Sequence, residues 1–290
     1  MTDASEITLT LGGEWRGNCG TAPCPCCQPE RRHDQRALSI RAEGNRLLTF
    51  CHKSGCDFRS VLQAAGMPAT TGAIDLAAAR ESSQKRAAYE AKQLARARKL
   101  WNGARSIRGT KGETYLRGRG INCPLPDSLR WASDCFHAPT ARWLSAMVAD
   151  VSTGGVHRTF FEKSGQRIER NDAKMMQGPC AGGAVALSEG PSRLVVAEGI
   201  ETGLSLLSGL LDGPAAVWAA LSTSGMRALH LPENPAELVV AADRDANGAG
   251  MAAAEALAER AQALGWAVWI WLPPEGQKDW NDALRAGVAA

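Results

Sequence analysis

Short hydrophobic runs alternate with longer helix-like stretches over the last hundred residues of the chain. The hydrophobic runs occupy residues 193–197, 216–218, 237–242 and 266–272. The stretches between and after them have helical composition and spacing at residues 200–211, 223–230 and 249–264. Strands that alternate with helices of these lengths form parallel sheets. Residues 191–290 are therefore expected to fold as a parallel α/β sheet.

The pattern is different in the first 190 residues. Short β-like runs at 38–40 and 47–50 lie among clustered cysteines. A turn-rich segment, GMPATTG at 66–72, then leads into a stretch whose Ala, Arg, Lys, Glu and Gln content favours a helix up to Trp101. We expect four parts along the chain: a small N-terminal module at 1–65, a linker and basic helix at 66–101, a basic mixed α+β subdomain at 102–190, and the parallel sheet at 191–290.

The net charge of +3 hides a strong division of charge along the chain. Residues 191–290 carry six basic and twelve acidic side chains, whereas residues 80–120 carry twelve basic and three acidic ones. A basic segment fits a polyanion, and an acidic region fits divalent cations. No apolar run approaches the ~18 residues of a membrane span, and the N-terminus has no signal-peptide pattern. We therefore expect a cytoplasmic protein without a membrane partner.

Acidic residues follow the hydrophobic runs of the expected sheet. Glu198 directly follows the first run, and Asp243 and Asp245 directly follow the third. Because ligand sites of open α/β sheets lie at the carboxyl ends of their strands, these side chains are candidates for one shared site. Carboxylates with waters and substrate phosphates are the ligands that Mg²⁺ prefers. Asp and Asn before a helix also serve as caps, which is the alternative interpretation.

The segments that carry these carboxylates resemble motifs of the Toprim family. Residues 195–202 (VVAEGIET) resemble its glutamate motif, and residues 239–248 resemble its DxD motif. Residues 278–284 (KDWNDAL) resemble the closing segment of the Toprim domain in phage-type and plasmid-type primases. The resemblance covers the last hundred residues and implies a Toprim-type sheet.

The resemblance also implies roles for individual residues. It implies that Glu198, Asp243 and Asp245 are the catalytic residues and that they hold Mg²⁺ or Mn²⁺, with Glu198 also in acid–base work. Asp279 and Asp282 are weaker candidates for a further metal contact. Glu201, three residues into the following helix, could face the site, but a surface position is expected.

The N-terminal cysteines have the spacing of a zinc ribbon. Cys24 and Cys27 form one C-x₂-C pair, and Cys51 and Cys56 form a second pair with four residues between them. Two such pairs supply the four thiolates of a closed tetrahedral zinc site, and clustered cysteines in a reducing compartment bind metal more often than they form disulfides. The module also resembles the N-terminal zinc module of primases, whose second pair is usually closer together. Three other residues compete as ligands: Cys19, Cys26 and His52.

The basic middle of the chain is a candidate for contacts with nucleic-acid phosphates. Residues 142–178 resemble the basic part of bacterial-type primase cores, which implies phosphate-facing roles there. Trp101 and Tyr115 are candidates either for stacking on bases or for core packing. The candidate phosphate-binding or nucleotide-binding residues are Arg105, Arg108, Arg117, Arg119, Arg142, Arg158, Lys174 and Lys278.

The order of these parts resembles the primases of mobile genetic elements. It implies a nucleotidyltransferase that joins ribonucleoside triphosphates into short RNA primers on single-stranded DNA, with a separate replicative helicase as a candidate partner. A Toprim topoisomerase is disfavoured, because Tyr89 and Tyr115 are the only tyrosines. The chain also has no G-x-x-x-x-G-K-[ST] motif of a fused helicase. A Toprim nuclease and a non-catalytic protein that binds single-stranded DNA or counters host defence remain alternatives.

Overall fold

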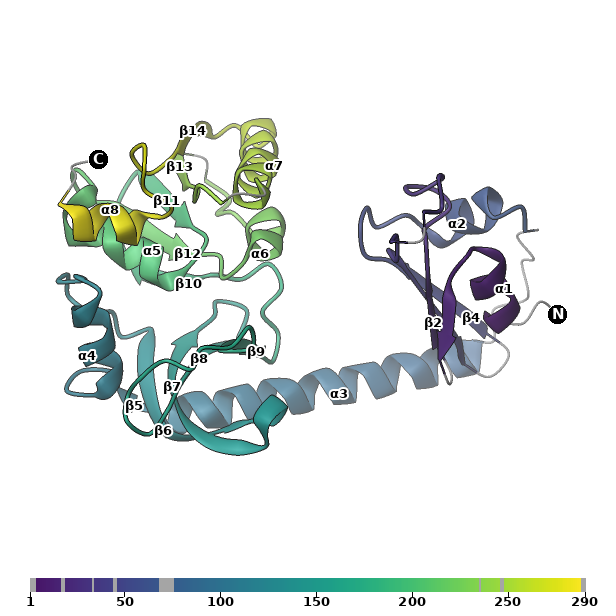
Figure 1. Ribbon diagram of the computed structural model, residues 1–290, viewed down its shortest axis with the longest axis horizontal. Helices are drawn as coiled ribbons and strands as arrows, with labels where there is room; N and C mark the ends of the chain where they lie inside the picture. The colour runs from purple at the N-terminus through teal and green to yellow at the C-terminus, as the bar shows by residue number, and fades with distance from the viewer. Residues whose placement is uncertain are drawn as a thin grey trace. The chain divides into compact units, whose positions relative to one another are not determined.

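The computed structural model describes residues 4–16, 19–32, 34–43, 46–67, 76–234, 236–245 and 248–287. The chain forms two compact units, Met1–Arg80 and Glu81–Ala290, here called the N-terminal and C-terminal units. Figure 1 labels their helices and strands. Most of the linker expected at 66–72 lies outside the described residues. No helix in the described part of the chain is long and apolar enough to cross a membrane.

The N-terminal unit contains a small antiparallel sheet. One short helix precedes the sheet in the sequence, and another follows it. Its strands hydrogen-bond in the order β1 (Glu14–Arg16), β2 (Cys19–Ala22), β3 (Leu38–Glu43) and β4 (Arg46–Cys51). The helices are α1 (Ala4–Thr10) and α2 (Phe58–Ala64). Ile7, Leu38 and Val61 lie in a hydrophobic cluster together with buried Cys24 and Cys51. Because this core is small and contains thiols, a metal bound there would contribute to its folding.

The C-terminal unit begins within the long helix α3 (Leu76–Gly103), whose C-terminal half packs on an antiparallel sheet. Ala97 and Trp101 on this helix share a core with Val148 and Phe160 on the sheet. The sheet has the order β5 (Arg105–Ser106), β6 (Leu129–His137), β7 (Arg142–Asp150), β8 (Val156–Phe161) and β9 (Lys174–Gln177). Helix α4 (Lys111–Gly118) follows β5, and a 3-10 turn (Ala138–Thr140) joins β6 to β7.

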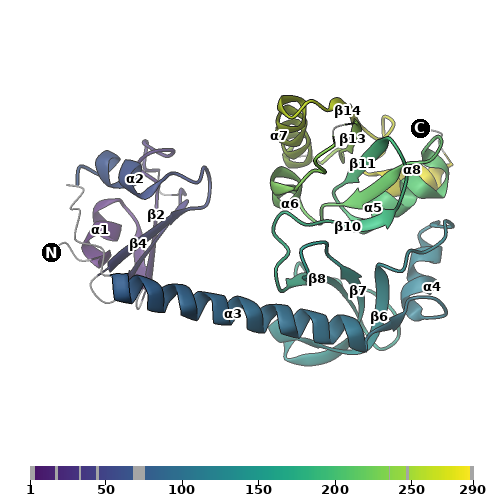
Figure 2. The same ribbon diagram turned by 180° about the vertical axis from the view of Figure 1, so that it is seen from behind.

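The second sheet of this unit is the parallel sheet expected from the hydrophobic runs. Its strand order is β10 (Val185–Ser188), β12 (Ala216–Ala219), β11 (Arg193–Ala197), β13 (Glu237–Ala241) and β14 (Ala267–Trp271), and only the edge strand β10 is antiparallel. The helices of the region are α5 (Ile200–Ser205) with a π-turn (Leu206–Leu210), α6 (Thr223–Ala228), α7 (Ala249–Ala263) and α8 (Trp280–Ala286). Helices α6 and α7 cover one face, and α5 and α8 cover the other (Figure 2). The fold class expected from the sequence is confirmed.

One hydrophobic core joins the two sheets of the C-terminal unit. Trp131 and Phe161 from the antiparallel sheet and Ile200 and Trp280 from the parallel region belong to the same buried cluster. Apolar burial stabilises by about 25 cal/mol per Å² of surface removed from water, so a shared cluster fixes both sheets in one arrangement. Side chains from β8 and β9 can therefore belong to the same site as the carboxyl ends of β11 and β13.

Candidate functional site

The strand register brings the sequence-predicted carboxylates to one edge of the parallel sheet. Ala197, the last residue of β11, lies opposite Ala241, the last residue of β13. Glu198 and Asp243 therefore leave neighbouring strands at the same edge. The Trp280 indole donates to the Ala242 carbonyl at 3.2 Å, which fixes the start of α8 beside them.

The charges at this edge repel one another. The pKa of Asp243 is raised to about 7, first by burial and then by the carboxylates of Asp279, Glu198 and Asp245. The pKa of Glu198 is raised by burial and by Asp245. The Asp243 Oδ1 atom is buried without a hydrogen-bond partner in the described structure. A cation would satisfy that atom and relieve the repulsion, so the residues present fit a bound Mg²⁺ ion.

One of the carboxylates caps a helix, as the alternative interpretation allowed, and another accepts from an amide in the first turn of α7, whose N-cap is Gly248. Asp279 is the N-cap of α8 and accepts from the Asp282 amide at 2.8 Å. The Asp245 carboxylate accepts from the Gly250 amide at 3.2 Å. Among the described residues, no three carboxylates have ligand atoms within 4.8 Å of one another. Mg²⁺ usually keeps several waters, so this spacing suits a hydrated ion or one that draws the loops together. Asp282 lies in the first turn of α8, where its amide donates to Asp279.

Glu201 lies inside the protein, which overturns the expectation of a surface position. It is 7% exposed, and its carboxylate accepts from Lys174 Nζ at 2.9 Å and from the Tyr115 hydroxyl at 3.3 Å. Burial opposes the charge on Glu201, but Lys174 dominates and the pKa of Glu201 is lowered to about 2. The same ammonium lowers the pKa of Glu198 and of Asp243. Lys174 therefore lies between a buried carboxylate and the candidate metal site.

His157 belongs to the same buried group. It is 4% exposed, and its pKa is lowered to about 4 by burial and by the Lys174 ammonium. The imidazole is therefore neutral at neutral pH and adds no second positive charge beside Lys174. His157 was not among the residues singled out from the sequence, although it precedes the candidate Arg158.

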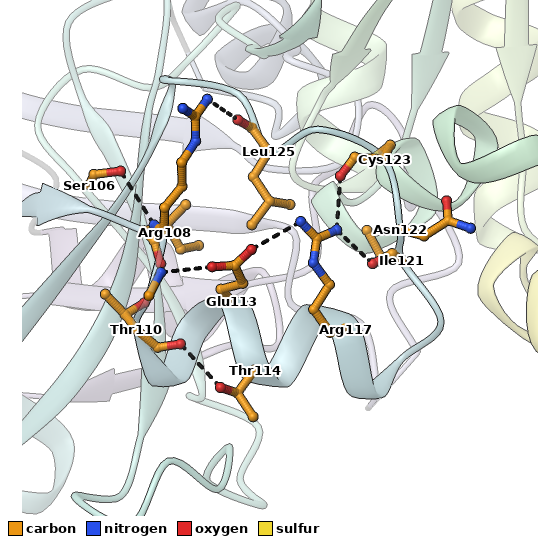
Figure 3. A network of polar contacts seen from close by, with 12 residues as sticks. Ser106, Arg108, Thr110, Glu113, Thr114, Arg117, Ile121, Asn122, Cys123 and Leu125 are labelled. Atoms are coloured by element: carbon orange, nitrogen blue, oxygen red, sulfur yellow. Dashed lines mark hydrogen bonds and ion pairs between the residues drawn. The ribbon is translucent and has the colours of Figure 1, made fainter.

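Two of the predicted phosphate-binding arginines donate to backbone carbonyls of the segment that follows helix α4 (Figure 3). Arg117 donates to the carbonyls of Ile121 and Cys123 at 2.9 and 2.8 Å and to the Glu113 carboxylate at 3.0 Å. Arg108 donates to the Leu125 carbonyl at 3.2 Å. These contacts satisfy backbone carbonyls after the helix and give Arg117 a structural role, whereas the Arg108 side chain is still 64% exposed.

The other predicted cations have different environments. Arg158 is 9% exposed and donates to the Met176 carbonyl, so its burial gives no support to a phosphate contact. Arg142 is exposed but forms a two-fold ion pair with Glu162 at 2.7 and 3.1 Å. Arg105 and Arg119 line two separate hollows of about 350 and 340 Å³. Lys278 is exposed beside the capping Asp279.

The structure brings the four expected cysteines of the N-terminal unit together. The Sγ atoms of Cys24, Cys27, Cys51 and Cys56 all lie within 4.8 Å of one another, and Cys27 and Cys51 are 3.6 Å apart. Sulfur atoms bound to one tetrahedral zinc ion at 2.3 Å are separated by about 3.8 Å, so the cluster could hold a metal ion. The competing residues lie differently. Cys19 is near the Arg16 carbonyl, His52 bonds Ser39, and Cys26 is a neighbour of the cluster.

The local structure around these thiols favours a metal-ligating state. Burial opposes a thiolate at Cys51, but the backbone amides of Ser54, Cys56 and Lys53 lower its pKa to about 6. Burial and the neighbouring thiols raise the pKa of Cys27 and of Cys56, a cost that a bound cation would offset. The Gln28 side chain accepts from the amides of Cys24 and Ala37, each at 3.1 Å, and so fixes the first knuckle against the start of β3. Partners that orient the ligands in this way are typical of metal sites.

Comparison with known proteins identifies two regions of the chain. Residues 193–290 match the family model of the Toprim domain, and residues 91–187 match that of a domain of unknown function, DUF7146. No curated protein matches. Among solved structures, the chain resembles the primase fragment of the bacteriophage T7 primase-helicase protein, with 15% identity over 92% of this chain and 94% of that one. The TM-score of that similarity is 0.38. The parallel sheet is of the Toprim type.

Proposed function

We propose that this protein is a DNA primase that joins ribonucleoside triphosphates into short primers on single-stranded DNA. The observation that carries the proposal is the group of mutually repelling carboxylates at the ends of β11 and β13, with the Lys174 ammonium beside it. Carboxylates that share a cation and an adjacent ammonium form a site for a polyphosphate. The Toprim match over residues 193–290 supports a nucleic-acid enzyme.

The chain's own residues have separate tasks in this reaction. Asp243 and Asp245, with Glu198 and the weaker candidate Asp279, hold Mg²⁺. Bound Mg²⁺ neutralises triphosphate charge and lowers the barrier to attack by a 3′-hydroxyl. Glu198, whose pKa is raised by burial, is suited to accept the hydroxyl proton. Lys174 is held by Glu201 at the edge of the site, where its ammonium can contact a phosphate. Positioning and charge stabilisation supply most of the catalysis.

The remaining parts of the chain are proposed to bind zinc and template. Cys24, Cys27, Cys51 and Cys56 are the proposed zinc ligands, because no other described group of His, Cys, Asp and Glu has ligand atoms so close together. Arg105 and Arg119, which line open hollows, are the proposed phosphate contacts from the basic segment. We also propose phosphate contacts for Arg142 and Lys278, and a separate replicative helicase as a partner.

Primer synthesis on single-stranded DNA tests the proposal directly. We expect wild-type protein to make short labelled RNA products only when Mg²⁺ or Mn²⁺ is present. Asp243→Asn should abolish synthesis, because an amide keeps the shape and loses the charge that holds the cation. Asp212→Asn is the matched control, since Asp212 is an exposed aspartate of the same region away from the carboxylate group.

Other outcomes would assign a different function. Full synthesis by Asp243→Asn would reject the metal-site role. Nicking of DNA by wild-type protein without any primer would keep the site and move the protein to the nucleases. Binding of single-stranded DNA with neither activity at any Mg²⁺ or Mn²⁺ concentration would identify a non-catalytic DNA-binding protein.

A further inference from the structure

Two large aromatic side chains lie together on the surface of the antiparallel sheet. Phe136 on β6 and Trp143 on β7 are direct partners in the strand register, with ring centroids 5.5 Å apart. They are 44% and 63% exposed. Their sequence neighbours Cys135 and Leu144 are buried against α3, so this pair is on the opposite face and the core does not need it. A contiguous exposed apolar pair marks a binding surface more often than a scattered single residue does.

The aromatic pair continues into a cationic hollow. Ser145 lies two residues after Trp143 on the same face of β7 and lines the hollow of about 350 Å³. The hollow also contains three cations, Arg105, Lys111 and Lys163, against one carboxylate, Asp134. Lys163 donates to Asp134 at 2.5 Å, which leaves Arg105 and Lys111 as its excess positive charge. Apolar rings and positive charge therefore lie side by side on one surface.

We propose that Phe136 and Trp143 form a platform on which unpaired bases of single-stranded DNA stack, while Arg105 and Lys111 contact the adjoining phosphates. Single-stranded nucleic acid offers flat apolar rings and negative charges at neighbouring positions, which this surface matches in both respects. A protein partner would use the rings but has no general need for the cations. The choice of DNA as the bound strand rests on the proposed function. The stacking of bases on the two rings does not depend on that function.

The platform replaces the stacking candidates considered from the sequence. Trp101 is buried, and the guanidinium of Arg130 lies 4.2 Å from its ring centroid. Tyr115 is half-buried, and its hydroxyl donates to Glu201. Tyr115 lines the hollow of Arg119, but Trp143 is more exposed than either ring, at 63%, and lies on the same face of β7 as Ser145 of the other hollow.

Oligonucleotide binding tests the platform without any catalytic step. The experiment measures the fluorescence anisotropy of labelled oligothymidylate with the full chain, in the absence of nucleotides and divalent ions. Stacking contributes about 1–3 kcal/mol per base, so Trp143→Ala should weaken binding by about 5-fold to 150-fold. Trp143→Phe keeps an aromatic face and should stay within about 3-fold of wild type. Trp269→Ala is the matched control, because Trp269 on β14 is 49% exposed and lies in the acidic region.

An abasic oligonucleotide of the same length separates stacking from charge. It should bind wild-type protein and Trp143→Ala equally, because it offers phosphates and no bases. Equal binding of oligothymidylate by wild type and Trp143→Ala would overturn the proposal. So would a result in which Trp143→Ala leaves DNA binding intact but changes the sedimentation of the protein alone, which would identify a protein contact.

The platform and the primase proposal can fail separately. A wild-type protein that makes no primer but shows the Trp143-dependent binding would lose the proposed activity and keep the platform. If the wild-type protein makes primers and Trp143→Ala changes neither synthesis nor DNA binding, the primase proposal stands and the platform is rejected. The melting temperature of Trp143→Ala should equal that of wild type, because the side chain is 63% exposed.

Discussion

Replacing Lys174 with methionine should leave the buried Glu201 carboxylate without a charged partner. Glu201 is 7% exposed, and its carboxylate has two side-chain partners, Lys174 at 2.9 Å and the neutral Tyr115 hydroxyl at 3.3 Å. Methionine keeps most of the length of lysine and removes the charge. The burial that now opposes ionisation of Glu201 would then dominate, and its pKa would rise above the ordinary 4.5.

The size of the effect follows from the pKa of Glu201. A decrease from 4.5 to about 2 corresponds to about 3 kcal/mol at 1.36 kcal/mol per pKa unit. The Lys174 side chain is 41% exposed, so water screens part of this attraction. Breaking a fully buried pair costs about 3–5 kcal/mol, and an exposed pair contributes about 0–1 kcal/mol. We expect Lys174→Met to lower the free energy of unfolding by about 2 kcal/mol at pH 7.

The sign of the pH dependence distinguishes this cause from a packing defect. In wild type the depressed pKa stabilises the fold above pH 4.5, and that contribution is lost as the pH falls from 4.5 toward 2. In Lys174→Met the folded pKa is above 4.5, so the variant loses stability as the pH rises from 4.5 through that pKa. The difference between the two proteins should therefore be largest at pH 7, smaller but still present at pH 4.5, and small only near pH 2.

Urea denaturation followed by tryptophan fluorescence is a suitable assay, since Trp15 is the only tryptophan outside residues 101–280. Glu201→Gln should cost less than Lys174→Met, because an amide can stay buried without a charged partner. The double variant should resemble Glu201→Gln alone, which gives a coupling energy between the two residues. A pH-independent loss below about 0.5 kcal/mol in Lys174→Met would refute the reasoning.

Three further predictions concern the other sites. Purified protein should contain about one zinc per chain by elemental analysis, and Cys24→Ser should release it, because four thiols share one cluster. Retention of zinc by that variant would move the site elsewhere. Arg105→Gln should reduce the slope of log affinity against log salt for single-stranded DNA by about 0.7, whereas Arg117→Gln should lower the melting temperature and leave the slope unchanged, since its guanidinium bonds backbone carbonyls. Without divalent ions, Asp243→Asn should raise the unfolding free energy more at pH 8 than at pH 5, because a carboxyl whose pKa is raised to about 7 destabilises the fold as the pH increases. An equal gain at both pH values would contradict the like-charge repulsion.

The strands of the Toprim-type sheet could be predicted because their signals are local. A run such as Arg193–Ala197 is hydrophobic at successive positions and is followed by a turn, so its limits are visible in the sequence. The positions of Glu198 and Asp243 then follow from sheet topology, since parallel strands end at a common edge. The same local reasoning found the four clustered cysteines, because their spacing in two pairs is typical of a zinc ribbon.

The environment of individual side chains could not be predicted, because it depends on distant segments. Glu201 is buried through its contact with Lys174, which is 27 residues away in the sequence and on another sheet. Trp101 and Trp143 have similar basic surroundings in the sequence, but only the first faces a core. Arg117 was predicted to contact phosphate. In the structure, the chain after α4 brings the Ile121 and Cys123 carbonyls within hydrogen-bonding distance of its guanidinium.

The shared core of the C-terminal unit has a consequence for how this protein can evolve or be engineered. Residues matched by the two family models, such as Phe161 on one side and Ile200 on the other, bury one another. Neither half would keep its apolar surface covered if it were expressed alone or joined to a foreign neighbour. The two sequence families should therefore be inherited as one block, and a change of side-chain volume on one side selects for a compensating change on the other.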